Sequence, residues 1–556
     1  MECARFIDTR IVFGPDVPAL CSSLVRLVGG PAVPPAWALG YLASSMAYTE
    51  AGDAQAQLAG FLAKLDAHAM PCDGFHLSSG YTTDEASGAR MVFTWNRSKV
   101  PDPELMFARF ERARVGVIAN VKPWLLDAHP AYAALERQGG FIRRRASDAA
   151  PLREMLWQGG AGTSATGSLI DFTSPSGYAF WKRSLTRELL ARGCRAVWND
   201  NNEFEVDDDD ARVHGEGGDT VGRSGRARQT LLMARASKEA LQEAGMRQPV
   251  VVSRSGCLGT HRYACQTWSG DNSTSFAAMR GNIRQMLSLG LCAWPGSGMD
   301  IGGFAGAMVT EELFVKWVRA GVWLPRFSIH SSSWKQGAGT NEPWMFPQSI
   351  GAVRAALQLR ERLKVQLFSL HRDANESGWP VCRPLLFHYQ RDARARAVDD
   401  AWMLGSDVLV APLLHAGEAA ERAIYIPQGS AFADVDALRV LEGGREHVVG
   451  AAADKGEFQL GCAVLVRVGG GLVLSGSAFE GRRPTGADAR VVVLVAGADG
   501  RAAVAWVEES SGARCAVEWR DGRVHHALGM PVSAQVYGAD AHGALKRLHR
   551  DPGARL

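Results

Sequence analysis

The sequence predicts an α/β fold, a (β/α)8 TIM barrel, followed by one or two antiparallel β-sandwich domains. The first observation is that short apolar runs alternate with longer amphipathic stretches from about residue 34 to about residue 370. The second is that short β-rich runs separated by turn residues replace this pattern after about residue 375. Alternating strands and helices indicate a parallel sheet with crossover helices, and seven or eight such units favour a closed barrel.

Each predicted barrel strand is an apolar run that ends in Gly, Asn, Asp or Ser. The runs cover residues 37–42, 74–77, 115–118, 196–198, 249–253, 289–293 and 322–325. The clearest helix-like segments between them cover residues 54–68, 178–192 and 229–244. In such a barrel the chemistry lies at the carboxyl ends of the strands, so the polar residues that follow each run are the candidates for a site.

Beyond the barrel, turn residues separate five β-rich runs and helical periodicity fades, which predicts antiparallel sheets. These runs cover residues 424–426, 463–468, 472–474, 490–495 and 515–519. The expected organisation is a short N-terminal segment over 1–34, a catalytic barrel over 35–373, a proximal β-sandwich over 374–470 and a distal β-rich region over 471–556.

Composition excludes several classes of protein. The 556 residues include 61 Lys+Arg and 58 Asp+Glu, a net charge of +3, with 46% hydrophobic and 21% charged residues. This mix is typical of a globular protein and excludes a largely disordered chain. The near-neutral charge argues against a nucleic-acid partner. The apolar stretch over 24–48 contains Arg26 and three prolines, so we expect no membrane span there.

The ten cysteines are scattered, with no CxxC pair and no zinc spacing. Residues 1–14 lack the basic region and apolar run of a signal peptide. These features predict free thiols in a reducing, cytoplasmic environment and no structural zinc.

Two acids follow predicted strands. Asp200 ends a strand in the segment AVWNDNNEF, and Asp271 follows an aromatic residue and a glycine turn. Carboxylates on two barrel strands can face one sugar ring, which is the arrangement that glycoside hydrolysis needs. From the spacing alone, two surface or structural acids are the alternative interpretation.

Several motifs, in order, resemble glycoside hydrolase family 31, the α-glucosidase clan. The family's nucleophile pattern W-x-D-M-N-E is similar to WNDNNE at 198–203, and its acid/base pattern W-x-G-D-N is similar to WSGDN at 268–272. Further matches are RS at 254–255, RY at 262–263, DIGGF at 300–304, PAWALGY at 35–41, PWMF at 343–346, GSDVLVAP at 405–412 and YIPQG at 425–429. The resemblance covers roughly residues 34–470.

The resemblance implies a retaining, exo-acting α-glycosidase in which Asp200 is the nucleophile and Asp271 the acid/base. It also implies that the sugar subsite is lined by Trp198, Arg254, Trp268, Asp300, Phe304 and His330. Family chemistry requires no metal and no cofactor, and the partner is an oligosaccharide or glycoside substrate. Lys122, just past the third strand, is a further candidate for a sugar contact, with a structural or solvated lysine as the alternative. The acidic run at 207–210 is interpreted as a solvated loop.

The chain also departs from the family pattern. Ser78 stands where the family has an aspartate that grips the far hydroxyls of the sugar, and Ser328 stands where it has an arginine. Asn201 replaces the usual Met after the nucleophile. Losing charged contacts weakens recognition of glucose, so we expect a 4-epimer such as an α-galactoside to be at least as good a substrate. Lys122 and Trp124 are the candidates for replacement contacts.

Other activities remain open at this point. The family usually carries a large β-sandwich before its barrel, and here only about 34 residues precede Pro35, so that domain is expected to be absent or truncated. A transglycosylase or a lyase would use the same barrel, and a non-catalytic carbohydrate-binding barrel is a rival from another class. The presence of both Asp200 and Asp271 argues against the last, because a binder needs neither acid.

Overall fold

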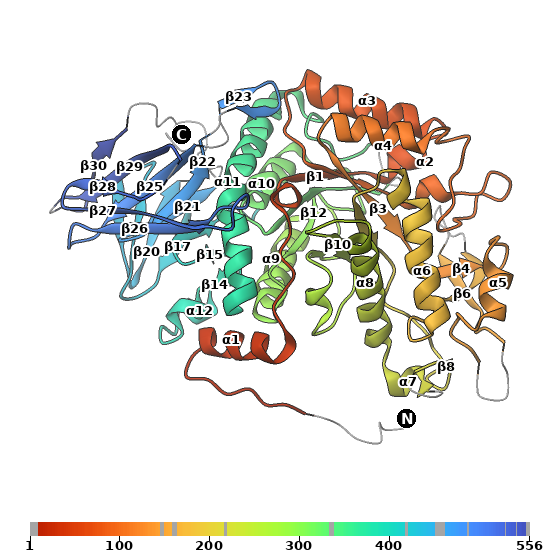
Figure 1. The fold of residues 1–556 in the computed structure, drawn as a ribbon. Coiled ribbons are helices and arrows are strands. Elements are labelled where there is room, and N and C mark those ends of the chain that lie inside the picture. Colours follow the sequence, from red (N-terminus) through yellow and green to blue (C-terminus); the bar gives the residue numbers. More distant parts are fainter. Residues whose placement is uncertain are drawn as a thin grey trace.

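The computed structural model describes residues 9–144, 150–157, 164–215, 219–332, 339–417, 421–450, 462–476, 478–485, 489–528, 530–540 and 542–551. A barrel and a β-rich C-terminal part stand on opposite sides of the long helix α11, Ile350–Ser377 (Figure 1). This arrangement confirms the predicted fold class. No helix in the described part of the chain is long and apolar enough to span a membrane.

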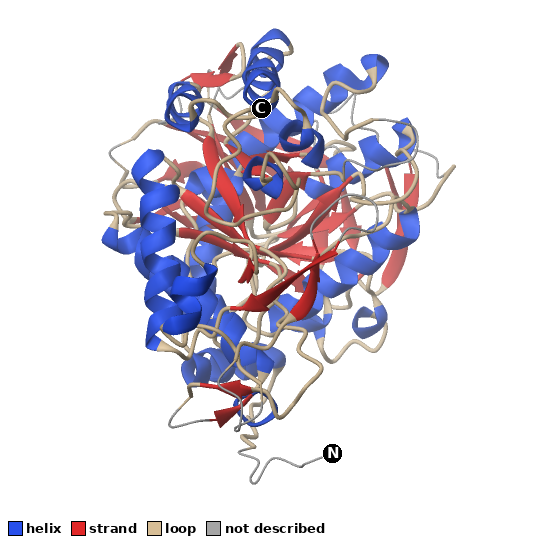
Figure 2. Cartoon of the chain, turned by 90° about the vertical axis from the view of Figure 1, so that its right-hand side faces the viewer, coloured by secondary structure: helices blue, strands red, loops and turns tan. Residues whose placement is uncertain are grey.

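Eight parallel strands form the barrel, and Figure 2 shows them at the centre of the surrounding helices. In chain order they are β1 Tyr41–Ser44, β2 Gly74–Leu77, β3 Gly116–Val121, β7 Ala196–Asn199, β10 Val250–Ser253, β11 Thr267–Trp268, β12 Ser297–Ile301 and β13 Arg326–Ile329. Strands that are consecutive in this order pair in space, except β10 and β11, and β13 pairs with β1. A parallel bridge between Val252 and Gln266 joins β10 to the segment before β11 and closes the barrel.

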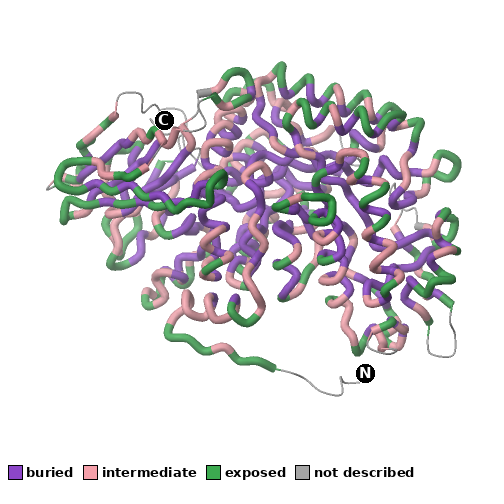
Figure 3. The backbone as a smooth tube through the Cα atoms, viewed as in Figure 1, coloured by how far each residue is buried: buried purple, intermediate pink, exposed green. Residues whose placement is uncertain are grey.

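The barrel helices bury one face against the strands and expose the other, as the alternation of purple and green along them shows (Figure 3). They are α3 Ala54–Ala67, α4 Pro103–Arg112, α6 Pro175–Glu188, α8 Arg226–Glu243, α9 Phe276–Leu291, α10 Glu311–Gly321 and α11. The side chains of Asp102, Ser275 and Thr310 cap α4, α9 and α10 by accepting a hydrogen bond from a backbone N–H three residues on. Such caps define where a helix begins.

Three predicted strands are wrong in position. Residues 289–293 form the end of α9 and the turn after it, and the strand of that unit is β12. Residues 322–325 form the turn that joins α10 to β13. The first run begins in a 3-10 helix, η1 Ala36–Leu39, so β1 starts later than expected. The physical reason is that a short buried apolar run has no periodicity that separates a strand from a helix end.

A small insertion follows β3. It contains α5 Tyr132–Arg137 and an antiparallel sheet of β4 Trp124–Leu126, β6 Ser164–Leu169 and β5 Glu154–Trp157. A second excursion, between β7 and α8, holds β8 Arg212–Val213, β9 Asp219–Thr220 and α7 Val221–Ser224. The insertion matters for the site because its strand β5 carries Trp157 to the cavity at the carboxyl ends of the barrel strands.

The C-terminal part consists mainly of antiparallel sheets. The first contains β14 Cys382–Pro384, β15 Trp402–Leu404, β16 Val408–Ala411, β21 Ala463–Arg467, β18 Ala431–Asp434 and β19 Arg439–Glu442, with β17 Glu421–Ile426 and β20 Arg445–Gly450 as a separate pair. The distal region has three sheets. The first contains β22 Gly471–Ser475, β25 Arg490–Ala496, β29 Val532–Ala539 and β30 Leu545–Arg550. The second contains β26 Ala502–Val507, β27 Arg514–Arg520 and β28 Arg523–His525, and the third pairs β23 Ala478–Glu480 with β24 Arg483–Thr485. The prediction that all these sheets are antiparallel is wrong for one pair of strands, because β25 and β29 run parallel.

Besides α3, two helices lie before the second strand. Helix α1, Val17–Val28, is capped by Asp16 and contacts α11 and the short helix α12, Leu386–Tyr389. The N–H of Val17 donates to the side chain of Gln390, the residue that follows α12, at 3.0 Å. Helix α2, Met46–Glu50, follows β1 directly, and its first residue therefore lies at the catalytic end of the barrel.

Candidate active site

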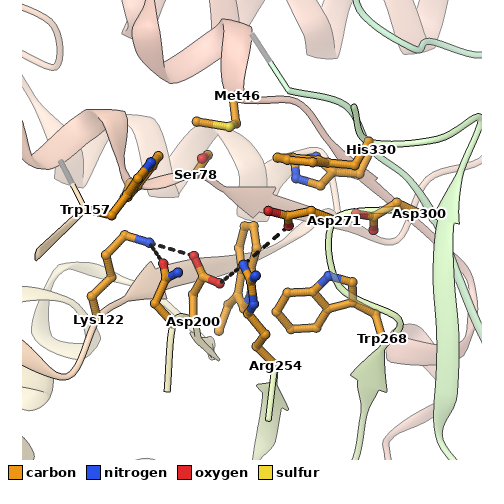
Figure 4. A pocket seen from close by; sticks show the side chains of 14 residues that line it. Met46, Ser78, Lys122, Trp157, Asp200, Arg254, Trp268, Asp271, Asp300 and His330 are labelled. Atoms are coloured by element: carbon orange, nitrogen blue, oxygen red, sulfur yellow. Dashed lines mark hydrogen bonds and ion pairs between the residues drawn. The ribbon is translucent and has the colours of Figure 1, made fainter. Parts of the chain in front are cut away.

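The carboxyl ends of the barrel strands surround a cavity of about 270 Å³ (Figure 4). All nine predicted site residues line it: Asp200, Asp271, Lys122, Trp198, Arg254, Trp268, Asp300, Phe304 and His330. The remaining lining residues are Met46, Ser78, Ser79, Trp157 and Asn201. The topology brings the predicted residues together because parallel strands end at one side of a barrel.

One guanidinium group bridges the two predicted catalytic acids. Asp200 follows β7, Asp271 follows the short strand β11, and Arg254 follows β10 between them. Arg254 Nη1 lies 3.5 Å from Asp200 Oδ1 and 3.3 Å from Asp271 Oδ1. Its Nε lies 3.0 Å from Glu203 Oε1, which fixes the orientation of the guanidinium. The two acids therefore share one cation and face the same cavity.

The surroundings separate the pKa values of the two acids. Burial alone would raise the pKa of Asp200, but the charges of Lys122 and Arg254, with hydrogen bonds from Asn120 and Lys122, lower it to about 2. Burial raises the pKa of Asp271 above its ordinary value, and Arg254 only partly offsets this effect. A lowered pKa on one carboxyl group beside a raised pKa on the other fits acid-assisted nucleophilic catalysis, which needs an ionised nucleophile and a proton donor.

The three asparagines next to Asp200 hold the loop that carries it in place. Asn201 has a φ of 49°, in the left-handed region that asparagine tolerates better than most residues. Asn202 donates to Ser253 Oγ at 2.9 Å and so ties the end of β7 to the end of β10. Asn199 accepts a hydrogen bond from α8 at 3.0 Å. Backbone and side-chain bonds thus fix the loop that carries the acid.

Lys122 contacts Asp200 directly. Its Nζ donates to Asp200 Oδ2 at 2.7 Å and also to Asn201 Oδ1. The ammonium lies 4.6 Å from the ring centroid of Trp157 and 5.7 Å from that of Trp124. Lys122 lines the cavity, as the sequence predicts, and it also bonds Asp200, a contact that no sequence pattern indicated.

Aromatic rings build the floor of the cavity. The ring of Trp198 packs edge-on against Trp268 and His330, with centroid separations of 5.6 and 5.7 Å, and Phe304 packs against His330 at 5.0 Å. Trp198 Nε1 and Asp300 Oδ2 are buried and have no hydrogen-bond partner among the described residues. Buried polar atoms are nearly always paired, so these two atoms are positioned to bond a ligand.

Asp300 and Arg326 are both buried, on the neighbouring strands β12 and β13. Burial raises the pKa of Asp300 to about 7, although the nearby Arg326 lowers it. Burial also lowers the pKa of Arg326 to about 10, and its Nη2 lies 3.2 Å from His76 Nε2. No sequence motif indicates Arg326, which lies two residues before Ser328 on β13 and is not part of the cavity lining.

One wall of the cavity is neutral. Met46, Ser78 and Ser79 line it, and no carboxylate stands where the family pattern has its strand-two aspartate. Trp124 is buried behind Lys122 and does not line the cavity, whereas Trp157 does. No motif indicated Trp157, because its place depends on how the insertion folds.

Metal ligands do not cluster in the described part of the chain, where no group of three or more His, Cys, Asp or Glu could hold an ion. In the predicted acidic loop, Asp209 forms an ion pair with Arg226 at 2.8 Å. The nine described cysteines are all free.

Comparison with known sequences gives matches over most of the chain. The model for the glycosyl hydrolases family 31 TIM-barrel domain matches residues 31–370, and the family 31 C-terminal domain matches residues 378–470. Neutral alpha-glucosidase AB of Sus scrofa is 30% identical over 461 residues, which are 80% of this chain and 46% of that protein. Alpha-glucosidase 2 of Bacillus thermoamyloliquefaciens is 27% identical over 465 residues, 80% of this chain and 55% of that protein. The chain thus spans about half the length of these relatives.

Solved structures share the fold. The glucosidase II alpha subunit in its Tris-bound form superposes with a TM-score of 0.81 at 20% identity, over 96% of this chain and 60% of that one. A family 31 alpha-xylosidase from Xanthomonas citri superposes with a TM-score of 0.79 at 21% identity, over 98% of this chain and 59% of that one. With the barrel, the cavity and the family match over most of its length, the chain belongs to glycoside hydrolase family 31.

Proposed function

We propose that this chain is a retaining, exo-acting α-glycosidase that works by double displacement. The observation that carries the proposal is the pair of acids, Asp200 and Asp271, which share Arg254 and line one cavity at the carboxyl ends of the barrel strands. Glycoside hydrolysis needs one carboxylate at the anomeric carbon and one acid at the leaving oxygen.

In the first step, an oxygen of Asp200 attacks the anomeric carbon and the bond to the leaving oxygen breaks. The electron pair goes to that oxygen, which takes the proton of Asp271. In the second step, water loses a proton to Asp271 and attacks the same carbon, and the ester bond to Asp200 breaks. Two inversions give net retention.

The spacing of the acids supports retention. One nitrogen of Arg254 contacts both carboxylates, so the contacted oxygens are no further apart than the sum of 3.5 and 3.3 Å. This limit includes the roughly 5–5.5 Å of retaining glycosidases and excludes all but the shortest of the roughly 6.5–9.5 Å separations of inverting ones.

For the sugar, we propose that a 4-epimer of glucose is at least as good a substrate as glucose itself. The neutral wall of Met46, Ser78 and Ser79 supports this proposal, because it offers no charged acceptor to the far hydroxyls of the ring. Relatives bear the names alpha-glucosidase, alpha-xylosidase and dextranase, so the family accommodates more than one sugar. The free cysteines support a reducing compartment, and we propose a cytoplasmic location.

The roles of the acids are tested by substitution. Asp200→Ala is expected to abolish turnover of every aryl α-glycoside. Asp271→Ala should retain the first step on substrates with good leaving groups, which need little protonation, and azide should rescue it with an α-glycosyl azide as product. Equal loss in both variants on all leaving groups, without rescue, would reject the assignment. A first product of β configuration by NMR would reject retention.

The sugar is tested by comparing kcat/KM for aryl α-glucoside and aryl α-galactoside under one condition. Each lost charge-assisted hydrogen bond is worth roughly 1.5–3 kcal/mol, so the galactoside should be turned over at least as efficiently as the glucoside. A preference for glucoside above about tenfold, or about 1.4 kcal/mol, would show that other contacts replace the missing charges.

A further inference from the structure

Lys122 and Asn120, at the end of β3, bond the same oxygen of Asp200. Asn120 Nδ2 donates to Asp200 Oδ2 at 2.9 Å, and Lys122 Nζ donates to it at 2.7 Å. The two residues lie two positions apart, which places both side chains on the inner face of the barrel. Lys122 is only 3% exposed, so its charge acts where water screens it little.

The two oxygens of Asp200 therefore differ. Oδ2 accepts two short hydrogen bonds, whereas among the described residues Oδ1 has only the 3.5 Å contact with Arg254. Arg254 also contacts Asp271, so Oδ1 lies on the side of the acid/base (Figure 4). If Oδ1 bonds the anomeric carbon, Oδ2 becomes the carbonyl oxygen of the ester.

We propose that Lys122 is a positioning residue for the second half of the reaction, in which it holds Oδ2 and stabilises Asp200 as the departing carboxylate. The proposal rests on the double displacement proposed above. When water attacks the anomeric carbon and gives its proton to Asp271, the bond from that carbon to Oδ1 breaks. The electron pair returns to Asp200, and the ammonium of Lys122 stands 2.7 Å from the carboxylate that forms.

The same charge acts in the opposite sense during the first step. It withdraws electron density from the attacking carboxylate and lowers its nucleophilicity. Removing the ammonium should therefore slow release of the sugar far more than its capture, so that the glycosyl-enzyme accumulates. A lysine that only contacted a sugar hydroxyl would have a different effect, because its loss would raise KM.

The experiment compares Lys122→Met with the wild type on a dinitrophenyl α-glycoside of the sugar that the wild type hydrolyses. We expect a burst of about one dinitrophenolate per active site, then a steady state about 10- to 100-fold slower, with KM lowered in parallel. Intact mass spectrometry should detect the chain plus one glycosyl unit, and kcat should become independent of the leaving group. Lys122→Arg, which keeps the charge, should restore part of the steady-state rate.

Lys182→Met is the matched control, since Lys182 pairs with Glu239 and Glu243 at 3.3 and 2.6 Å on helices α6 and α8. It should leave all these kinetics unchanged. If thermal unfolding shows that Lys122→Met does not fold, Lys122→Gln provides the same comparison with a neutral donor. A lower kcat with unchanged or raised KM and no burst would overturn the proposal.

The outcomes separate this proposal from the one on which it rests. A wild type that hydrolyses no aryl α-glycoside, or that first releases a β product, would reject the double displacement itself. A wild type that retains configuration, combined with a Lys122 variant that shows no accumulated intermediate, would reject only the role of Lys122.

Discussion

At the scale of single residues, Arg254 sets the electrostatics of the site. Its guanidinium contacts Asp200, Asp271 and Glu203, and it is the one cation that touches both proposed catalytic groups in the described structure. A positive charge favours the ionised form of each carboxyl, so Arg254 lowers the pKa of both Asp200 and Asp271. The pH range of activity should therefore depend on this residue.

We predict that Arg254→Met shifts both limbs of the pH profile of kcat/KM to higher pH. The acidic limb follows ionisation of Asp200, whose pKa rises from about 2 when a neighbouring cation is lost. The basic limb follows loss of the proton from Asp271, whose pKa also rises without Arg254. The measurement needs a substrate with a poor leaving group, whose departure requires that proton. Arg254→Lys should shift the limbs less, and limbs that stay fixed in Arg254→Met would contradict the prediction.

The site was predictable where its chemistry lies in contiguous motifs. Asp200, Asp271 and Arg254 stand in recognisable local patterns at strand ends, and a barrel brings strand ends together. Arg326 and Trp157 were not predictable in the same way. Arg326 lies on β13, two positions before the position at which the family pattern has its arginine. Trp157 reaches the cavity only through the fold of the insertion.

At the scale of elements, α11 closes the amino-terminal end of the barrel through one side chain. Arg360 is fully buried, and its guanidinium donates to four backbone carbonyls at the entries of β1 and β13. The acceptors are Leu39, Val322, Leu324 and Pro325. Buried carbonyls need a hydrogen-bond donor, and this one arginine provides it for the turns before both strands.

We predict that Arg360→Leu lowers the free energy of unfolding by at least about 3 kcal/mol, because several buried carbonyls lose their donor. Arg354→Leu on the same helix should cost only about 1 kcal/mol, since Arg354 donates to one carbonyl, that of His68, at 2.8 Å. Urea unfolding of both variants checks the difference. Equal decreases in the free energy of unfolding would show that the packing of α11, and not the hydrogen bonds of Arg360, stabilises the amino-terminal end of the barrel.

Most barrel elements were predictable because their runs are bounded by turn residues. The predicted run 74–77 coincides with β2, and the predicted helix 54–68 differs from α3 by one residue. The failures lie where helix and strand follow each other closely, at 289–293 and 322–325. There the apolar composition is the same for both structures, and only tertiary contacts decide between them.

At the scale of the whole molecule, α11 belongs to both halves. One face carries Arg360 to the barrel, and another receives hydrogen bonds from the distal sheets. The N–H of Val473 donates to Gln366 at 3.3 Å, and the N–H of Val507 donates to Ser369 at 3.1 Å. One hydrophobic cluster extends without a break from the barrel to distal strands β22 and β25. The predicted domain boundary at 373–374 falls in the last turn of this helix.

We predict that the barrel and the C-terminal sheets unfold in one cooperative transition, because separating them would expose the buried faces of α11. Loss of glycosidase activity and loss of near-ultraviolet circular dichroism should therefore share one midpoint in a thermal scan. Calorimetry should give equal calorimetric and van't Hoff enthalpies. Two resolved transitions, with activity lost in only one of them, would contradict the prediction.

The insertion that carries Trp157 has a consequence for the history of such enzymes. Most of the cavity is built from strand ends, and a change there alters the barrel that all other residues depend on. Trp157 stands on a small sheet of its own, joined to the barrel through short connections after β3 and before α6. New substrate preferences can thus arise by exchanging this appendage while the acids and their supporting bonds stay intact. The cavity wall that carries Trp157 can therefore change in evolution while the residues proposed to carry out the reaction stay the same.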